Sequence, residues 1–463
     1  MLRTAAVAAL VTTLVAGAVL AQGVTQPTTI PGDWELYDEP LPPVEQVAAG
    51  PQAGRMIYGL YTWAGEYKQY HDGFRGVGWP AYRVAGPMDD DAMRLIVQDD
   101  VEIMQTLGLR VHGQSKRRPD YESDEAFVAD YVSGIEAYLT RYGPRGTFFK
   151  ENSGLPHRPI RYIEIWNEPN FQYMIPDDSS RPRQELEAER EALYAKVLPA
   201  AYKAVKARWP AVNVVGFGAG GASHGDVRFI RHVHDLNLAV KDSYDVLSTH
   251  PYISTPPESW SIRSWGGYGT AKGLMEIREI MAKHGVSKPV WYTEIGWSIS
   301  QQDGGFYDLS GRRSTVSATL QAAYVCRQYA VSLRRGVQRV HIMFAADTDN
   351  TNTGMFNRDG TWRPVAHAIR TMMNMMPNPA LLDAVSDGAD GYYAYLFRAD
   401  MDKPASPRVI MAWNVAGPKT VEIPIDAPQV MVTDMLGKAG VATAAGGKVS
   451  VEIGPCPVYI ALP

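Results

Sequence analysis

The sequence predicts an α/β fold, in which a (β/α)8 TIM barrel is followed by a C-terminal antiparallel β-sandwich. Two observations lead to this fold class. From Met56 to about Met376, strand-like and helix-like segments alternate, and eight such units in roughly 320 residues suit a barrel with some enlarged loops. After Pro377 the helical patterns give way to short β-like runs separated by Gly, Pro and Asp. A doubly wound sheet is the alternative for the first region.

The N-terminal residues precede this pattern and are expected to lie outside the barrel. Residues 1–21 combine Arg3, an apolar stretch up to Leu20 and a small-residue cleavage site ending at Ala21, which is typical of a signal peptide. An uncleaved anchor is the alternative, but the apolar run is short for a bilayer. Residues 22–55 are rich in Pro and Thr and form a linker or N-terminal extension. We therefore expect a secreted or periplasmic protein with no membrane span in the mature chain.

The barrel segment, residues 56–376, contains eight expected strands rich in β-branched and aromatic residues. They are Met56–Thr62, Ala81–Val84, Leu109–Gly113, Tyr162–Trp166, Val212–Phe217, Tyr244–His250, Val290–Glu294 and Val337–Phe344. Apolar residues at helical spacing predict helices between them. The clearest are Asp90–Leu107, Asp124–Tyr142, Glu185–Trp209, Thr270–His284 and Thr315–Arg335.

The C-terminal segment, residues 377–463, is expected to form the β-sandwich. Its β-like runs are Gly391–Arg398, Arg408–Asn414, Thr420–Ile425, Gln429–Asp434 and Lys448–Ile453. Because no row of exposed aromatic residues is visible in these runs, a module that braces the barrel is favoured over one that binds sugar.

The composition excludes some classes of partner. The chain of 463 residues is 45% hydrophobic and 21% charged, with a formal net charge of −5 and no basic stripe, which argues against nucleic acid. The 11 Trp and 25 Tyr residues mildly favour a carbohydrate ligand. Cys326 and Cys456 are the two cysteines; an exported address permits a disulfide between them, and a buried free thiol at Cys326 is the alternative. Nothing in the sequence indicates an oligomeric state.

Two glutamates stand at the carboxyl ends of expected strands. The segment Tyr162–Asn170 reads YIEIWNEPN and places Glu168 where a buried strand gives way to a loop, with Pro169 barring a helix. The segment Pro289–Trp297 reads PVWYTEIGW and places Glu294 in the same way. The carboxyl ends of barrel strands share one rim, so the two side chains are expected to meet there. A pair of carboxylates about 5–5.5 Å apart is the equipment of a retaining glycosidase, with one acid/base and one nucleophile. This chemistry needs no metal or organic cofactor.

The motifs IWNEPN and YTEIGW resemble the signatures of clan A glycoside hydrolases, over about Met56 to Met376. The stretch from Tyr142 to Asn170 is most similar to family 39, whereas the segment around Glu294 is similar to strand seven of glucanase families. The resemblance implies a retaining hydrolase of O-glycosidic bonds, acting on a poly- or oligosaccharide through a glycosyl-enzyme intermediate. Glu168 would be the acid/base and Glu294 the nucleophile.

The same resemblance extends to supporting positions. Arg83 resembles the arginine that hydrogen-bonds the nucleophile, and Asn167 the asparagine that contacts the sugar 2-hydroxyl. His250 and Tyr252, in STHPY, resemble the residues of strand six beside the nucleophile. Phe344 stands where many members of the clan carry Trp at the end of strand eight. Trp297, which follows the expected seventh strand, is a further candidate for substrate binding or support.

Two other functions remain open from the sequence. Gly221–Gly225 matches the Gly-x-Ser-x-Gly pattern of a serine esterase, with Ser223 as nucleophile and Asp245 and His284 in the required chain order. Against this, a Gly-rich loop separates Ser223 from the preceding apolar run. The second alternative is a barrel that binds carbohydrate without cleaving it, which the presence of both glutamates disfavours.

Overall fold

The computed structural model describes residues 57–86, 88–108, 116–221, 225–253, 255–259, 261–262, 267–299, 315–347 and 352–462. The expected signal peptide and extension, the expected strand Leu109–Gly113 and the candidate Ser223 lie outside these ranges.

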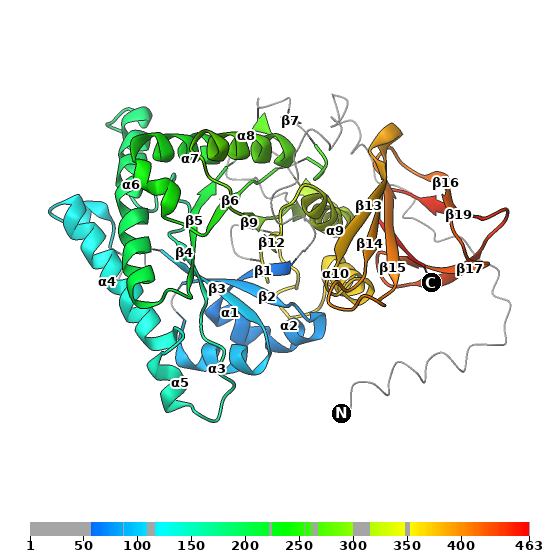
Figure 1. Cartoon of the computed structure of the whole chain (residues 1–463), viewed down its shortest axis with the longest axis horizontal. Coiled ribbons are helices and arrows are strands. Elements are labelled where there is room, and N and C mark those ends of the chain that lie inside the picture. The colour runs from blue at the N-terminus through cyan, green and yellow to red at the C-terminus, as the bar shows by residue number, and fades with distance from the viewer. Residues whose placement is uncertain are drawn as a thin grey trace.

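Eight parallel strands close into a barrel, as predicted (Figure 1). Around the ring the order is β1-β12-β9-β6-β5-β4-β3-β2. The strands are β1 (Ile57–Trp63), β2 (Ala81–Ala85), β3 (Glu102–Leu107), β4 (Tyr162–Ile165), β5 (Asn213–Gly220), β6 (Val246–His250), β9 (Val290–Ile295) and β12 (Arg339–Ile342). Two short pairs accompany the connections, β7 (Ser261–Ile262) with β8 (Gly267–Tyr268) and β10 (Ser298–Ile299) with β11 (Thr315–Val316).

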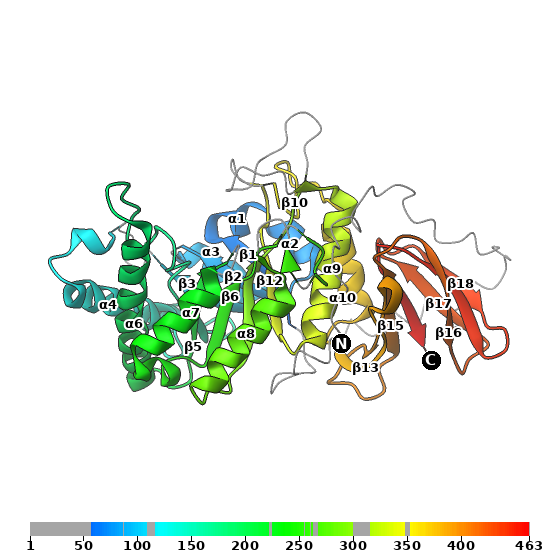
Figure 2. The ribbon, with the colours of Figure 1, turned by 90° about the horizontal axis from the view of Figure 1, so that it is seen from above.

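Helices surround the barrel (Figure 2). They are α1 (Ala64–Gln69), α2 (His71–Val77), α3 (Asp90–Gln98), α4 (Asp124–Tyr142), α5 (Thr147–Glu151), α6 (Arg183–Arg208), α7 (Gly225–Leu236), α8 (Thr270–Lys283), α9 (Ala318–Arg334) and α10 (Pro364–Met375). None of the helices in the described part of the chain is long and apolar enough to cross a membrane.

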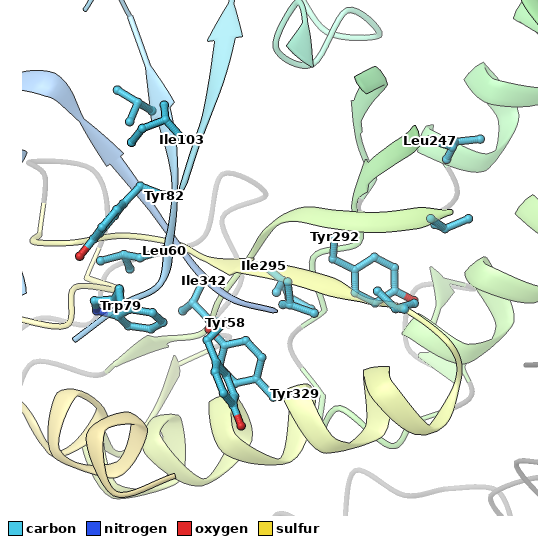
Figure 3. Close-up of a cluster of buried hydrophobic side chains, with 14 of the residues drawn as sticks. Tyr58, Leu60, Trp79, Tyr82, Ile103, Leu247, Tyr292, Ile295, Tyr329 and Ile342 are labelled. Carbon is cyan, nitrogen blue, oxygen red and sulfur yellow. The ribbon is translucent and has the colours of Figure 1, made fainter. Parts of the chain in front are cut away.

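The main hydrophobic core lies between the outer surface of the strands and the helices. Leu60 of β1, Tyr82 of β2 and Ile342 of β12 are buried in it, and Tyr58 meets Tyr329 of α9 edge-on with ring centroids 4.9 Å apart (Figure 3). Burial of this apolar surface is the main favourable term in folding. Because the apolar side of each strand faces this core, the other side faces the inside of the barrel.

The third strand lies earlier in the chain than predicted. The prediction of one helix over Asp90–Leu107 is wrong beyond Gln98, where α3 ends, and residues 102–107 form β3 instead. Val101, Met104 and Leu107 fit helical spacing, but so short an apolar stretch is equally compatible with a buried strand. Asp100 takes a positive φ of 60° at the turn between the two elements.

The C-terminal strands form two packed layers. A six-stranded antiparallel sheet has the order β13-β14-β15-β20-β17-β18, and β16 pairs with β19 in the second layer. Ile410, Val430 and Ile460 of the larger sheet share a buried cluster with Val421 and Val449 of the smaller one. The strands are β13 (Ala380–Asp387), β14 (Tyr392–Arg398), β15 (Arg408–Asn414), β16 (Lys419–Pro424), β17 (Gln429–Asp434), β18 (Ala439–Thr443), β19 (Lys448–Ile453) and β20 (Val458–Leu462). This confirms the predicted sandwich and adds β13, β18 and β20.

The larger sheet turns its other face toward the barrel, next to α9 and α10 (Figures 1 and 2). Tyr393 and Trp413, whose rings stack 5.2 Å apart, belong to the barrel's own core cluster. The Trp413 indole donates to the Glu258 carboxylate at 2.8 Å, and Arg327 of α9 donates to both oxygens of that carboxylate at 2.7 and 2.6 Å. Cys326, also on α9, and Cys456 are both buried, and neither forms a disulfide. This packing is what a bracing module requires.

Candidate active site

Glu168 and Glu294 meet at the carboxyl end of the barrel. Glu168 follows β4, and Glu294 is the penultimate residue of β9. One carboxylate oxygen of each, together with a ring nitrogen of His250, lie within 4.8 Å of one another. This separation is near the approximately 5–5.5 Å of retaining glycosidases and below the approximately 6.5–9.5 Å of inverting ones.

A β-bulge turns Glu294 toward the inside of the barrel. The pairs Tyr292–Val340 and Ile295–Ile342 flank two residues on β9 but a single residue on β12. Tyr292 and Ile295 therefore both pack outside the barrel, although residues three apart on a regular strand face opposite sides (Figure 3). The extra residue leaves Glu294 pointing inward, where it contacts Arg83.

Local backbone geometry positions Glu168. Its φ of 47° lies in the left-handed region, which is uncommon for a residue with a side chain. Its N–H donates to the carbonyl of Gly218 at 2.9 Å, which anchors the loop to β5. A Cβ at Gly220 would come within 2.5 Å of Glu168 Oε1 and 2.4 Å of Phe171 Cε2. Only glycine leaves room for the carboxylate and the ring together.

Arg83, on β2, connects the floor of the site to Glu294. Its Nη1 donates to Glu294 Oε1 at 2.5 Å, and its Nη2 donates to Asn167 Oδ1 at 2.7 Å. The guanidinium also donates to Glu164 through Nε at 2.7 Å. Arg83 is fully buried and has no contact with solvent, so its positive charge is balanced by the carboxylates of Glu164 and Glu294.

Glu164, on β4, is a charged residue of the site that the sequence prediction missed. It is fully buried inside the barrel, and the hydroxyls of Thr106 and Ser248 each donate to it at 2.9 Å. The signal was present in the sequence, since Glu164 is a charged residue in the middle of the otherwise apolar strand that ends at Glu168. Burial pushes its pKa up, but the positive charge of Arg83, together with His250 and the hydrogen bonds that Glu164 accepts, outweighs this effect and the pKa of Glu164 is lowered.

Tyr252 and His250 contact the two carboxylates from the end of β6. The Tyr252 hydroxyl donates to Glu294 Oε2 at 2.7 Å, so both oxygens of Glu294 have a donor. His250 Nδ1 lies 3.2 Å from Glu168 Oε1 and 3.8 Å from Glu294 Oε1. Both residues thus lie where the sequence placed them.

The protonation equilibria of these groups differ. Burial raises the pKa of Glu168; the hydrogen bond from His250 opposes this, and the negative charge of Glu294 adds to it. Burial lowers the pKa of His250, but the charges of Glu294 and Glu168 outweigh that effect and leave the pKa raised. Burial, reinforced by Glu294, also raises the pKa of Tyr252, which stays a hydroxyl and a donor.

Aromatic residues line the side of the site near β1. Phe344 packs on Tyr61 with ring centroids 5.0 Å apart, and Arg83 lies over the same Tyr61 ring at 4.6 Å. Trp63, at the end of β1, is 41% exposed, and on the opposite side Phe171 is 36% exposed next to Glu168. Trp63 and Phe171 did not emerge from the sequence as candidates.

Trp297 does not join this group. Its ring is 2% exposed, its Nε1 donates to the Thr255 carbonyl at 3.0 Å, and it meets Tyr324 of α9 edge-on at 5.4 Å. It thus ties the loop after β6 to α9, which is a supporting position and leaves no ring face for a ligand.

Comparison with solved structures shows which known proteins share this fold. A family 39 glycoside hydrolase from Bacteroides cellulosilyticus WH2 superposes with a TM-score of 0.63 at 18% identity, over 90% of this chain and 82% of that one. The fold is that of clan A glycoside hydrolases. A monomeric β-xylosidase from Caulobacter crescentus CB15 has a TM-score of 0.56 at 13% identity, over 89% and 97% of the two chains. A family 86 β-porphyranase from Bacteroides plebeius has a TM-score of 0.59 at 11% identity, over 90% and 76%. No protein-family model and no curated protein matches the sequence.

The predicted resemblance to this clan is therefore confirmed at the level of the fold. The lengths also agree, because the alignment with the β-xylosidase spans nearly the whole of that chain. Two of these neighbours, the β-xylosidase and the β-porphyranase, are named for different sugars, so the shared fold carries no information about the sugar that this chain accepts.

A metal is not favoured at this site. Within the described ranges, Glu168, His250 and Glu294 are the one group of three possible ligands close enough to share an ion. Arg83 already donates to Glu294 at 2.5 Å, so a cation there would face a fixed positive charge.

The other two residues of the candidate esterase triad, Asp245 and His284, lie at the end of the barrel opposite to Glu168 and Glu294. Asp245 precedes β6 and pairs with Lys206, and His284 ends α8 and lies 3.1 Å from Asp235. Both positions are at the amino ends of the strands, whereas Gly221 follows the carboxyl end of β5, where its N–H donates to the His250 carbonyl at 3.1 Å.

Proposed function

We propose that this protein is an exported retaining glycoside hydrolase that cleaves O-glycosidic bonds by double displacement. The observation that carries the proposal is the meeting of Glu168 and Glu294 within 4.8 Å at one rim of a clan A fold, with Arg83 and Tyr252 donating to Glu294. Two carboxylates in such different surroundings divide into a proton donor and a nucleophile.

In the first step, a Glu294 oxygen attacks the anomeric carbon while the bond to the leaving oxygen breaks. Hydrogen bonds from Arg83 and Tyr252 hold the two oxygens of Glu294 in place for this attack. Glu168 gives its proton to the leaving oxygen, and its raised pKa keeps that proton bound to a higher pH than an ordinary carboxyl group would.

In the second step, water releases the sugar from Glu294. Esterification has removed the negative charge that helped to raise the pKa of Glu168, so Glu168 now accepts the proton of the attacking water. Asn167 uses Oδ1 to accept from Arg83, which leaves its amide group to donate to a sugar 2-hydroxyl.

Covalent trapping tests the mechanism. A 2-deoxy-2-fluoro glycoside with an activated leaving group should label Glu294, as a mass increase on the peptide that contains it, and Glu294→Gln should stay unlabelled. Proton NMR of the first product should show retained anomeric configuration. An inverted product would refute double displacement, and failure of every glycoside to react would favour a barrel that binds sugar without cleaving it.

The substrate class is a poly- or oligosaccharide, and the sugar and linkage require a direct screen. The enzyme should be incubated with plant, algal and bacterial polysaccharides and the released oligosaccharides identified by mass. Export is proposed from the signal-like residues 1–21; N-terminal sequencing of the protein from the medium or periplasm should find cleavage near Ala21.

A further inference from the structure

Glu164 is a buried carboxylate for which the mechanism above has no use. It lies one layer below the reacting groups, and its side chain is fully buried. Arg83 donates to it at 2.7 Å, and the hydroxyls of Thr106 and Ser248 each donate at 2.9 Å. Glu164 is therefore fixed, ionised and out of reach of a substrate.

Arg83 is shared between Glu164 and Glu294. Its Nη2 lies 2.6 Å from Glu164 Oε2, and its Nη1 lies 2.5 Å from Glu294 Oε1. In the resting enzyme, one buried cation thus has two anionic partners. Asn167, its third partner, is neutral and cannot replace either of them.

The proposed reaction changes this charge balance. When the bond between a Glu294 oxygen and the anomeric carbon forms, the carboxylate becomes a neutral ester, and the leaving oxygen takes the proton of Glu168. Negative charge therefore moves from Glu294 to Glu168, away from the group that Arg83 contacts. A buried arginine without an anion is strongly disfavoured, because its charge has lost both water and a counter-charge.

We propose that Glu164 is a positioning residue that keeps Arg83 paired while Glu294 is esterified, and so stabilises the glycosyl-enzyme intermediate. The inference rests on the function proposed above. Without Glu164, forming the ester would strip Arg83 of its last carboxylate, whereas hydrolysing the ester would restore one. Glu164 should therefore favour the first chemical step over the second.

The test is pre-steady-state kinetics of Glu164→Gln with an activated aryl glycoside. Gln keeps the size and an acceptor for Arg83 but removes the charge. Glycosylation should slow by about 10- to 100-fold, the scale of one charge-assisted contact, while deglycosylation stays unchanged or becomes faster. The burst of released phenol should shrink, and less fluoro-sugar label should accumulate on Glu294.

Ser248→Ala is the matched control, because it removes a hydrogen bond to the same carboxylate and keeps the charge. It should preserve the ratio of the two rates. If Glu164→Gln does not fold, as judged by thermal unfolding, Glu164→Asp should show a smaller change in the same direction, since it lengthens the ion pair with Arg83. Equal slowing of both steps in the Glu164 variants would reduce Glu164 to a structural role and overturn the proposal. Failure of the wild type to form any glycosyl-enzyme would instead overturn the proposed function.

Discussion

The two walls of the candidate active site hold their carboxylates in opposite ways. On the β9 wall, both oxygens of Glu294 are fixed, by Arg83 at 2.5 Å and Tyr252 at 2.7 Å. On the β4 wall, the one side-chain hydrogen bond of Glu168 among the described residues is the 3.2 Å contact with His250. A nucleophile must stay ionised and aimed, whereas an acid/base must lose and regain a proton. The difference in restraint matches the two tasks proposed for Glu294 and Glu168.

Glu294→Gln should have the largest effect. Without a nucleophile, kcat should fall by roughly 10⁴- to 10⁶-fold on every substrate, including those with activated leaving groups. Steady-state kinetics on aryl glycosides measures this. Glu279→Gln, an exposed carboxylate on α8, is the control and should behave as the wild type. Comparable activity of Glu294→Gln would remove Glu294 from its role.

Glu168→Ala should have a smaller effect that depends on the leaving group. With a poor leaving group, kcat/KM should fall by about 10²- to 10⁴-fold, because the leaving oxygen is no longer protonated. With a dinitrophenyl leaving group the first step should be nearly unaffected, and azide should speed the second step by replacing water. An equal loss for both leaving groups would contradict the assignment of Glu168 as the acid.

Tyr252→Phe removes one of the two donors to Glu294. A hydrogen bond to a charged group is worth about 1.5–3 kcal/mol, so kcat/KM should fall by roughly 10- to 100-fold while the fold is kept. Circular dichroism checks the fold. If the β9 wall tolerates this loss without change, the restraint of Glu294 comes from Arg83 alone.

His250→Ala should sharpen the comparison through pH. The contact with His250 opposes the rise in the pKa of Glu168, so removing it should raise that pKa further. The acid form of Glu168 would then persist to higher pH, and the alkaline limb of kcat/KM should move up by roughly 1 pH unit. A shift toward lower pH would mean that His250 acts on another group.

Phe171→Ala should give the smallest effect. The ring is exposed beside Glu168, on the side where the leaving group is protonated. We expect a loss of about 2- to 10-fold in kcat/KM for substrates with a sugar leaving group and none for glycosyl fluorides, which carry no ring there. Trp63→Ala, on the β1 side, is the comparison variant. Equal losses on fluorides would place Phe171 outside the leaving-group side.

The sequence was sufficient to predict the barrel and most of the side chains that lie together at its rim. Strand-end positions decide which residues meet at the rim, so Glu168, Glu294, Arg83 and Tyr252 could be assigned to it from their motifs. The third strand is predicted too late in the chain, because the seven residues Val101–Leu107 are too few to distinguish the period of a helix from that of a strand.

Other features depend on contacts that no local pattern encodes. The bulge in β9, which turns Glu294 inward, appears only in the pairing with β12. The local pattern includes Glu164 in an apolar strand, because its pairing with Arg83, 81 residues away in the chain, is visible only in the folded structure. Trp is a residue type that often binds sugars, but Trp297 is buried against α9, which lies further along the sequence.

The contact of Trp413 and Arg327 with Glu258 bears on how this protein can be divided. A shortened chain that ended at α10 would retain a buried acid and lose the indole that caps it, together with the aromatic cover of Tyr393. Such a fragment should be insoluble or unstable, so engineering or domain exchange in this protein has to keep the barrel and the β-sandwich together.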